Sequence, residues 1–374
     1  MDNPIPLSLP DITDLEIQAV VDVLRTNRLS LGPRQVAFEE AIRDFVGARY
    51  ACALSSGTAA LHLALLAAGV GPGDEVITSS FSFIASANCA LYVGAKPVFA
   101  DIDPATWNID PDALEAAITP KTKAVIPVHV FGQPCRMDRI MAAAKKHSLA
   151  VVEDSCEAIG AAFGGRKAGT IGQSGTFAFY PNKQITTGEG GMLVTDDEKV
   201  ASLARSLRNQ GRAEKATWLA HERLGYNYRM CELQAALGEA QMKRISDILA
   251  KRARAAGWYT QRLAGFEKLR LQKIEPDVTM SWFVFVIRLA DEFSQEHRDR
   301  LIAGLGQQGI GCNAYFTPIH LQTFYREQLG CRPGQLPVTE KVGERSLAIP
   351  FFSNISEGQV DRVCGAIRRI VDGF

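Results

Sequence analysis

The sequence predicts a large α/β domain with a mostly parallel sheet, followed by a smaller C-terminal α+β domain. Short apolar strands alternate with helical patterns from residue 50 to residue 154, which is typical of parallel sheets covered by helices on both faces. From about residue 198 the alternation gives way to longer helices and fewer strands. The 374 residues suffice for two domains. We place the large domain, with an N-terminal helical segment, at residues 1–250 and the small one at residues 251–374.

The elements follow in order. Two helical patterns come first, over residues 14–26 and 35–46, with a Leu-Gly-Pro break between them. In the alternating region the predicted strands are residues 50–54, 75–78, 97–101, 123–128 and 150–154, and the helices are residues 59–68, 84–93, 111–118 and 137–147. Strands 176–180 and 192–195 then flank a glycine-rich turn, and helices follow at 199–207 and 233–255. The small domain contains strands 281–289 and 311–316 and helices 294–308 and 358–371.

Composition excludes several classes of partner. Lys plus Arg and Asp plus Glu both number 41, so no overall field attracts nucleic acid or an anionic membrane. No apolar run reaches the ~20 residues of a membrane helix, and the N-terminus lacks the pattern of a signal peptide. The eight cysteines are scattered without a C-x-x-C pair, which is typical of reduced thiols rather than a disulfide framework or a metal site. We therefore expect a cytoplasmic protein without a bound metal.

One lysine lies in a conspicuous position. Lys183 follows the aromatic-rich strand 176–180 and precedes the glycine-rich turn at residues 188–191. Burial at a strand end favours the neutral, nucleophilic amine, which can form a Schiff base with a carbonyl compound such as pyridoxal phosphate. A solvated loop lysine is the alternative, and this stretch alone gives the two interpretations similar weight.

Other polar residues stand at predicted strand ends, where parallel sheets bind ligands. The Ser-Ser-Gly-Thr turn at residues 55–58 precedes a helix, and the exposed N–H groups there suit a phosphate, although a plain helix cap is commoner. Asp154 ends a strand and could hold a protonated pyridine nitrogen, or simply terminate the strand. Phe83 could stack on a cofactor ring or lie in the core, and Phe81 is the other candidate.

This order of phosphate turn, aromatic residue, strand-end aspartate and lysine resembles fold-type I pyridoxal phosphate enzymes, the aspartate aminotransferase-like transferases. More closely, the chain resembles the DegT/DnrJ/EryC1/StrS family of sugar aminotransferases. The matching segments are residues 55–61, 71–77, 153–160, 179–183, 188–191 and 225–229. The likeness covers nearly the whole chain, and the motifs are specific in combination.

The resemblance implies a role for each residue of the site. Lys183 is the Schiff-base lysine and moves protons during the reaction. Asp154 pairs with the pyridine nitrogen of pyridoxal phosphate, and Phe83 stacks on its ring. Gly57 and Thr58 hold its phosphate.

Four further positions carry expectations from the family. Asn227 is expected to reach the cofactor phosphate of the neighbouring subunit, which implies a homodimer with shared active sites. Glu157 replaces the Gln or His that many members place near the cofactor's 3-hydroxyl, and some sugar 4-aminotransferases share this departure. Ala178 replaces a serine that often contacts the phosphate. His320 matches a segment near the sugar nucleotide, but a structural histidine is about as plausible.

The implied reaction transfers an amino group from L-glutamate, which leaves as 2-oxoglutarate, to a keto group of a nucleotide-linked deoxysugar. Amination at C4 is favoured over C3, and the product would serve surface-polysaccharide or antibiotic biosynthesis. A cyclitol or another non-nucleotide keto acceptor is the alternative. Related 3-dehydratases carry histidine at the lysine position, so Lys183 argues against that reaction. A non-catalytic regulator would not need Lys183, Asp154 and the phosphate turn together.

Overall fold

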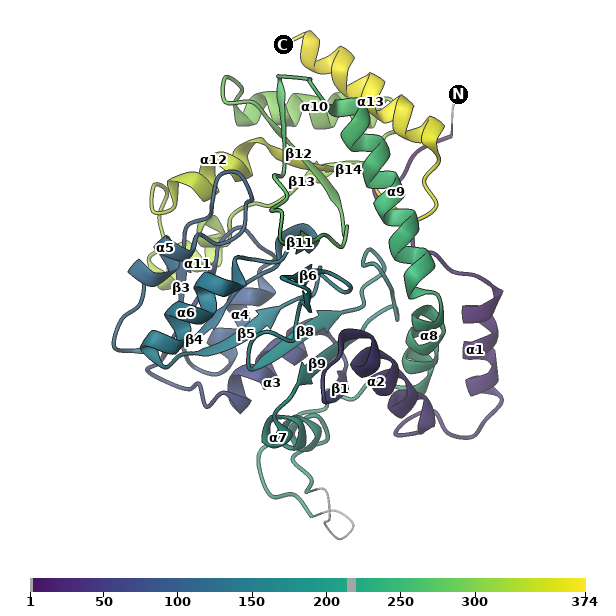
Figure 1. Cartoon of the computed structure of the whole chain (residues 1–374), viewed down its shortest axis with the longest axis vertical. Coiled ribbons are helices and arrows are strands. Elements are labelled where there is room, and N and C mark those ends of the chain that lie inside the picture. Colours follow the sequence, from purple (N-terminus) through teal and green to yellow (C-terminus); the bar gives the residue numbers. More distant parts are fainter. Residues whose placement is uncertain (1–2, 214–219) are drawn as a thin grey trace.

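The computed structural model describes residues 3–213 and 220–374 (Figure 1). A seven-stranded sheet in the order β1-β9-β8-β5-β4-β2-β3 forms its centre. The strands are β1 (Tyr50–Leu54), β2 (Glu75–Ser79), β3 (Lys96–Ala100), β4 (Thr122–Ile126), β5 (Ala150–Asp154), β8 (Ser174–Ala178) and β9 (Gly191–Thr195). Strand β9 runs antiparallel to both neighbours, whereas β8, β5, β4, β2 and β3 pair in parallel. The predicted α/β fold with a large, mostly parallel sheet is confirmed.

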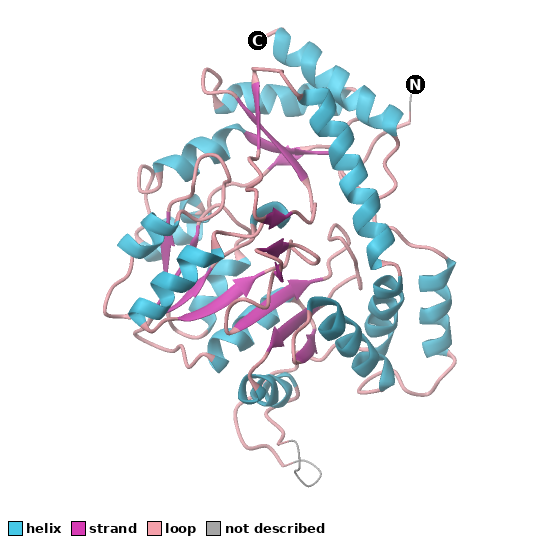
Figure 2. Cartoon of the chain, in the orientation of Figure 1, coloured by secondary structure: helices cyan, strands magenta, loops and turns pink. Residues whose placement is uncertain are grey.

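Helices cover both faces of this sheet because successive strand residues point to opposite sides. Cys52 and Leu54 of β1 pack in one core with α3 (Gly57–Ala67), α4 (Ala85–Tyr92) and α7 (Glu198–Arg208). Ala51 and Ala53 pack in another core with α2 (Pro33–Val46) and α8 (Glu232–Lys243). Helices α5 (Pro111–Ala116) and α6 (Met137–His147) cover the other end of that second face (Figure 2). The result is a three-layered α/β unit.

A second, four-stranded antiparallel sheet lies beyond the main one, in the order β10-β12-β14-β13. Its strands are β10 (Leu269–Leu271), β12 (Phe285–Leu289), β13 (Asn313–Ala314) and β14 (Ser346–Ile349), and its helices include α10 (Gln295–Gln307), α12 (Pro337–Arg345) and α13 (Glu357–Asp372). The sequence predicted longer versions of β12 and β13 and missed β10, β14, α12 and α11 (Thr323–Leu329). Ile5 packs in this second core and bridges to Ile310, so the segment around Ile5 contacts the C-terminal part. The division at residue 250 stays a prediction.

A small third sheet, in the order β11-β6-β7, pairs segments from both parts of the chain. Strands β6 (Ala162–Phe163) and β7 (Arg166–Lys167) follow β5 in the sequence, whereas β11 (Val278–Thr279) belongs to the C-terminal part. Strand β11 leads directly into the segment before β12, and that segment contributes to the cavity described below.

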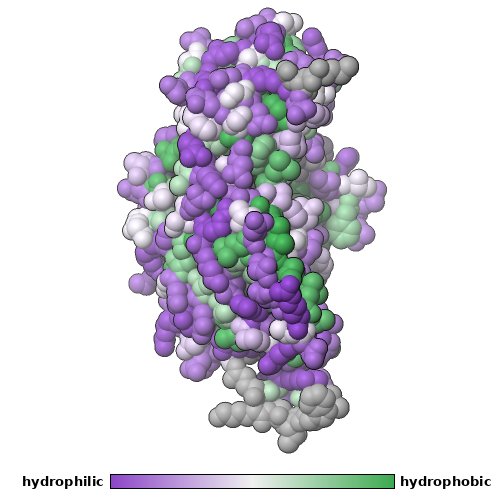
Figure 3. All heavy atoms as spheres, turned by 90° about the vertical axis from the view of Figure 1, so that its right-hand side faces the viewer, coloured by the Kyte–Doolittle hydropathy of each residue, from purple (hydrophilic) through white to green (hydrophobic). Residues whose placement is uncertain are grey.

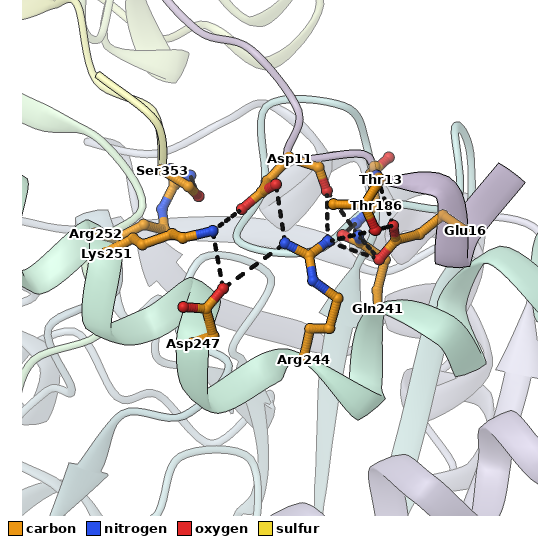
Figure 4. A network of polar contacts seen from close by, with 10 residues as sticks. All are labelled: Asp11, Thr13, Glu16, Thr186, Gln241, Arg244, Asp247, Lys251, Arg252 and Ser353. Carbon is orange, nitrogen blue, oxygen red and sulfur yellow. Dashed lines mark hydrogen bonds and ion pairs between the residues drawn. The ribbon is translucent and has the colours of Figure 1, made fainter. Parts of the chain in front are cut away.

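The predicted helix at residues 233–255 is two helices, which corrects the sequence analysis. Helix α8 ends and α9 (Ile245–Leu263) begins around Arg244, whose φ of −113° and ψ of 6° leave the helical range. Figure 4 shows the Arg244 guanidinium between Asp11, at 3.0 Å, and Glu16, at 2.9 Å. Lys251 also contacts Asp11 at 3.1 Å. These ion pairs fix the segment that leads into α1 (Asp14–Leu24) against the junction of the two helices.

The N-terminal region exposes large apolar side chains. They include Leu9, Ile12, Leu15, Ile17, Leu24, Leu29, Leu31 and Val36. Figure 3 faces the side of the molecule where α1, α8 and α9 lie, and apolar groups are visible there among polar ones. Clustered apolar exposure is typical of a surface that another chain covers. Within residues 3–213 and 220–374, no helix combines the length and the apolar composition that crossing a bilayer requires.

The contact between α2 and α8 yields a stability prediction. Gly238 of α8 faces the buried Phe38 of α2, and a Cβ at residue 238 would lie 2.6 Å from the ring. Gly238→Ala should therefore lower the free energy of unfolding by about 1–3 kcal/mol through overpacking. Gly257→Ala is the matched control. Gly257 lies in α9, and a Cβ at this position would meet no atom within 4 Å. It should stabilise by roughly 0.5–1 kcal/mol. Urea unfolding measures both, and equal effects would contradict the packing argument.

Candidate functional site

A cavity of about 510 Å³ lies at the carboxyl ends of β1, β5 and β8. This is the edge where parallel α/β sheets bind ligands. Residues from both parts of the chain form its wall. They are Ser56, Gly57, Thr58, Leu61, Ser82, Phe83, Ala85, Ser86, Val128, Asp154, Cys156, Glu157, Ala178, Tyr180, Asn182, Lys183, Glu189, Gly190, Phe283, Tyr315 and Phe316.

The N-terminus of α3 forms one wall of the cavity. Ser56 caps the helix, with its Oγ accepting a hydrogen bond from Ala59 N at 3.1 Å. A Cβ on Gly57 would lie 2.7 Å from Ala178 Cβ and 2.9 Å from Cys156 Sγ, so only glycine allows this approach. The first N–H groups of a helix have no partner within the helix and attract anions. The turn predicted to hold a phosphate therefore opens into the cavity.

Asp154 ends β5 with its carboxylate in the cavity wall. Ser86 Oγ donates to its Oδ2 at 2.7 Å, and Cys156 N donates to its Oδ1 at 3.2 Å. The backbone N–H of Asp154 donates to Pro127 O at 2.9 Å. These contacts orient a buried carboxylate toward the cavity.

Glu153, the preceding residue, points away and anchors the same strand end. Its carboxylate accepts from Gly169 N at 2.8 Å and Gly172 N at 2.6 Å and lies 2.9 Å from His129 Nε2. Because His129 Nδ1 accepts from Cys135 N at 3.1 Å, the ring proton lies on Nε2 and is donated to Glu153. The sequence analysis missed this pair. The feature of the sequence that could have indicated this pair is a glutamate inside an otherwise apolar strand, because a buried carboxylate needs a hydrogen-bond partner.

Lys183 extends into the cavity with its side chain 13% exposed. Its Nζ lies 3.5 Å from Glu157 Oε1 and 3.9 Å from the centre of the Phe283 ring. The amine is therefore held between a carboxylate and an aromatic face. Glu157 is itself buried, and Phe131 N donates to its Oε2 at 2.9 Å. Burial raises the pKa of the Glu157 carboxyl, against the opposing effect of the Lys183 charge.

The two candidate phenylalanines are clearly separated. Phe83 lines the cavity and is 63% exposed, so its ring is available to a ligand. Phe81 is fully buried and packs edge-on against Phe131 and Phe316. Residues 81–83 form an irregular turn before α4, and this turn places Phe81 in the core and Phe83 at the cavity.

Two of the residues proposed from the sequence do not line this chain's cavity. Asn227 is exposed, in a segment where Tyr226 and Tyr228 stack at 5.0 Å. His320 is 0% exposed, with Nδ1 at 2.7 Å from Ser80 Oγ and Nε2 at 3.0 Å from Glu340 Oε1. These bonds satisfy both ring nitrogens, which favours the structural alternative for His320.

Several residues of the cavity wall were not predicted from the sequence. Phe283, Tyr315 and Phe316 come from the C-terminal part, and no local pattern marks them as close to Lys183. Asn182 adjoins the lysine, and its buried Oδ1 has no hydrogen-bond partner within the described residues. Such an orphaned acceptor fits a bound group that carries donors. In the same described part of the chain, no three His, Cys, Asp or Glu residues are placed to hold a metal ion.

Comparison with known proteins connects this geometry to a family. Residues 10–368 match the DegT/DnrJ/EryC1/StrS aminotransferase family. The spore coat polysaccharide biosynthesis protein SpsC of Bacillus subtilis is 41% identical, over 99% of this chain and 97% of that protein. GDP-perosamine synthase of Caulobacter vibrioides is 40% identical, over 98% of each chain.

Solved structures agree with the sequence match. The putative sugar aminotransferase Spr1654 of Streptococcus pneumoniae, in its PMP form, superposes with a TM-score of 0.94 at 30% identity, over 99% of each chain. Helicobacter pylori PseC, an aminotransferase of pseudoaminic acid biosynthesis, gives a TM-score of 0.94 at 28% identity over the full length of both chains. Spr1654 has also been solved in its PLP form, which shows that relatives of this fold carry the cofactor. The chain therefore belongs to the DegT/DnrJ/EryC1/StrS family, and it is a pyridoxal phosphate-dependent sugar aminotransferase of fold-type I.

Proposed function

We propose that the enzyme transfers the amino group of L-glutamate to the keto group of a nucleotide-linked deoxysugar, at C4 rather than C3. The observation that carries the proposal is the Lys183 amine inside a cavity that also presents Asp154 and the N-terminus of α3. The 40% identity to a GDP-perosamine synthase supports a nucleotide-linked sugar, and the likeness to SpsC supports polysaccharide synthesis. Glu157, which some sugar 4-aminotransferases share, favours C4.

Each residue of the wall has a proposed task. Lys183 attaches the cofactor and then moves a proton between the reacting carbons. Asp154 keeps the ring nitrogen protonated, and Phe83 stacks on the ring. Gly57 and Thr58 bind the phosphate at the start of α3. When bound, the cofactor delocalises the charge left on the substrate carbon as its proton leaves. Because both half-reactions use one cavity, the kinetics should be ping-pong.

We further propose a homodimer whose sites are shared. Ala178 in the cavity wall offers no hydroxyl to the phosphate, so another donor has to contribute. Asn227 is exposed and stays outside its own cavity, as a residue that serves a partner would. The exposed apolar residues between positions 9 and 36 supply a surface for a second copy to cover.

Glu157 has a proposed role beside the cofactor's ring hydroxyl, in place of Gln or His. Its raised pKa means that burial of the carboxylate costs free energy, which the Lys183 charge only partly offsets. The neutral form of the carboxyl is a hydrogen-bond donor as well as an acceptor. Glu157 can therefore donate to or accept from a ring oxygen according to pH.

The first prediction from the proposed function tests the reaction itself. A panel of 4-keto and 3-keto sugar nucleotides is incubated with glutamate and the enzyme, and products are identified by mass spectrometry. We expect an amino sugar nucleotide from a 4-keto acceptor together with 2-oxoglutarate. Lys183→Ala should abolish this product, and borohydride should fix pyridoxal phosphate on the Lys183 peptide of the wild type. Amination of the 3-keto acceptors alone would refute the C4 assignment, and label on another lysine would refute the assignment of Lys183.

The second prediction concerns Glu157→Gln and the pH dependence of stability. Because the folded-state pKa of Glu157 is raised above 4.5, its contribution is fully present below that pH and is lost as pH rises through the folded pKa. Gln cannot titrate. Over this window the cofactor-free wild type should lose unfolding free energy relative to Glu157→Gln, by at most about 1.4 kcal/mol per pH unit. Denaturant unfolding at several pH values measures the slopes, and parallel curves would contradict the raised pKa.

The third prediction tests the shared site by mixing Lys183→Ala with Asn227→Asp. The new carboxylate should repel the cofactor phosphate. If Asn227 acts across the interface, both defects of a mixed dimer fall on one site, and the other site is intact. Mixtures should then recover up to about half of the wild-type activity per heterodimer.

The matched control mixes Lys183→Ala with Asp154→Asn. Both of these residues line the cavity of their own chain, so every site in the heterodimer stays defective and no activity should return. Affinity tags on the two variants verify that heterodimers form. Absence of recovery for Lys183→Ala with Asn227→Asp, with heterodimers present, would show that Asn227 serves its own subunit.

A further inference from the structure

We propose that Arg252 is a positioning residue for Lys183, because it fixes the backbone that holds the Phe283 ring against the lysine amine. The inference rests on the proposed role of Lys183 as the cofactor-bearing lysine.

Arg252 is a buried cation with no direct ion pair among the described residues, although the charge of Asp11 partly offsets the effect of burial on its pKa. It lies in α9, 2% exposed, and the ion pairs found within the described chain do not include it. Its guanidinium lies 5.1 Å from the centre of the Phe351 ring, and Nη1 is 3.4 Å from Ser353 Oγ. Burial lowers the pKa of Arg252 to about 10. A buried charge with neutral partners costs free energy, so its other contacts have to compensate.

The shortest of those contacts are hydrogen bonds from Arg252 to two backbone carbonyls. Arg252 Nε donates to Trp282 O at 2.8 Å, and Nη2 donates to Phe283 O at 2.6 Å. The planar guanidinium holds two consecutive carbonyls at once, which lysine cannot imitate. Helix α9 therefore fixes the conformation of the segment that enters β12.

That segment touches the lysine loop at two places. Phe283 is buried, and its ring centre lies 3.9 Å from Lys183 Nζ. Gln184 Nε2, next to the lysine, donates to Ser281 O at 3.1 Å. The chain around Lys183 therefore contacts Ser281 and Phe283, and Arg252 holds the carbonyls of residues 282 and 283 in the same segment.

The contact has a chemical consequence for the amine. The face of an aromatic ring attracts an ammonium ion but not a neutral amine, and such a contact is worth ~0.5–2 kcal/mol. The Phe283 ring also shields the amine from solvent. Displacing the ring should therefore make the Lys183 amine more reactive toward electrophiles from solution.

The experiment measures this reactivity directly. Full-length, cofactor-free protein is treated with acetic anhydride at a series of pH values, and acetylation of each lysine is followed by peptide mass spectrometry. Arg252→Met and Phe283→Leu should each speed acetylation of Lys183 roughly two- to thirtyfold, which corresponds to loss of the cation–π contact. Because both act through one contact, the double variant should exceed neither single variant.

Arg254→Met is the matched control, since Arg254 lies two residues along the same helix with its guanidinium 5.5 Å from the Trp258 ring and its side chain exposed. It should leave Lys183 acetylation unchanged.

If Arg252→Met only lowers the melting temperature and its Lys183 is acetylated at the control rate, the proposal is overturned. Should Arg252→Met fail to fold, Arg252→Lys decides, because it keeps the charge but cannot hold both carbonyls. The wild-type rate in that variant would also overturn the proposal.

The outcome is separable from the test of the proposed function. The acetylation rate measures the reactivity of the Lys183 amine in its surroundings, and this measurement does not depend on whether the enzyme aminates a sugar. Failure of amine transfer with a positive acetylation result would refute the proposed reaction alone. Borohydride fixation on Lys183 with unchanged acetylation in the variants would refute the role of Arg252 alone.

Discussion

The end of β5 is the constraint on which the site depends. Glu153 and Asp154 are adjacent, so strand geometry sends their carboxylates to opposite sides. Glu153 accepts N–H groups from Gly169, Ile171 and Gly172 and thereby fixes the return of the chain into β8. Asp154 faces the cavity, and β8 leads to Lys183. One buried carboxylate thus sets the relative position of the two residues proposed to contact the cofactor ring and its aldehyde carbon.

The sequence was most informative where local pattern decides structure. Strands of the main sheet were predicted to within a few residues because each is a short apolar run. The strand-end position of Asp154 and the place of Lys183 in the turn after β8 followed from those runs. The break at Arg244 depends on Asp11 and Glu16, more than two hundred residues away, so helical periodicity could not show it. Phe283 reaches Lys183 only through tertiary packing, which the sequence pattern does not encode.

For Phe83 and His320, the residue type is compatible with either a core or a ligand-binding role, and their burial in the structure distinguishes the two roles. Phe81 and Phe83 have the same chemistry, and only their burial, complete for Phe81 and slight for Phe83, separates a core ring from a cavity ring. His320 could have met a ligand, but Ser80 and Glu340 already occupy both of its nitrogens. The position of a residue in a motif therefore does not by itself assign it to a ligand site, because its polar atoms can already be bonded within the protein.

The charge of the cavity wall supports the proposal that a second chain contributes to the site. Among the lining residues of the described chain, Lys183 is the only cationic side chain, whereas Asp154, Glu157 and Glu189 are acidic. The cofactor phosphate, glutamate and a sugar nucleotide are all anionic, so the side chains alone would repel them. The dipole of α3 offsets this at the phosphate, and a protonated ring nitrogen offsets Asp154. In the proposed homodimer, the second copy would supply further positive charge from beyond this wall.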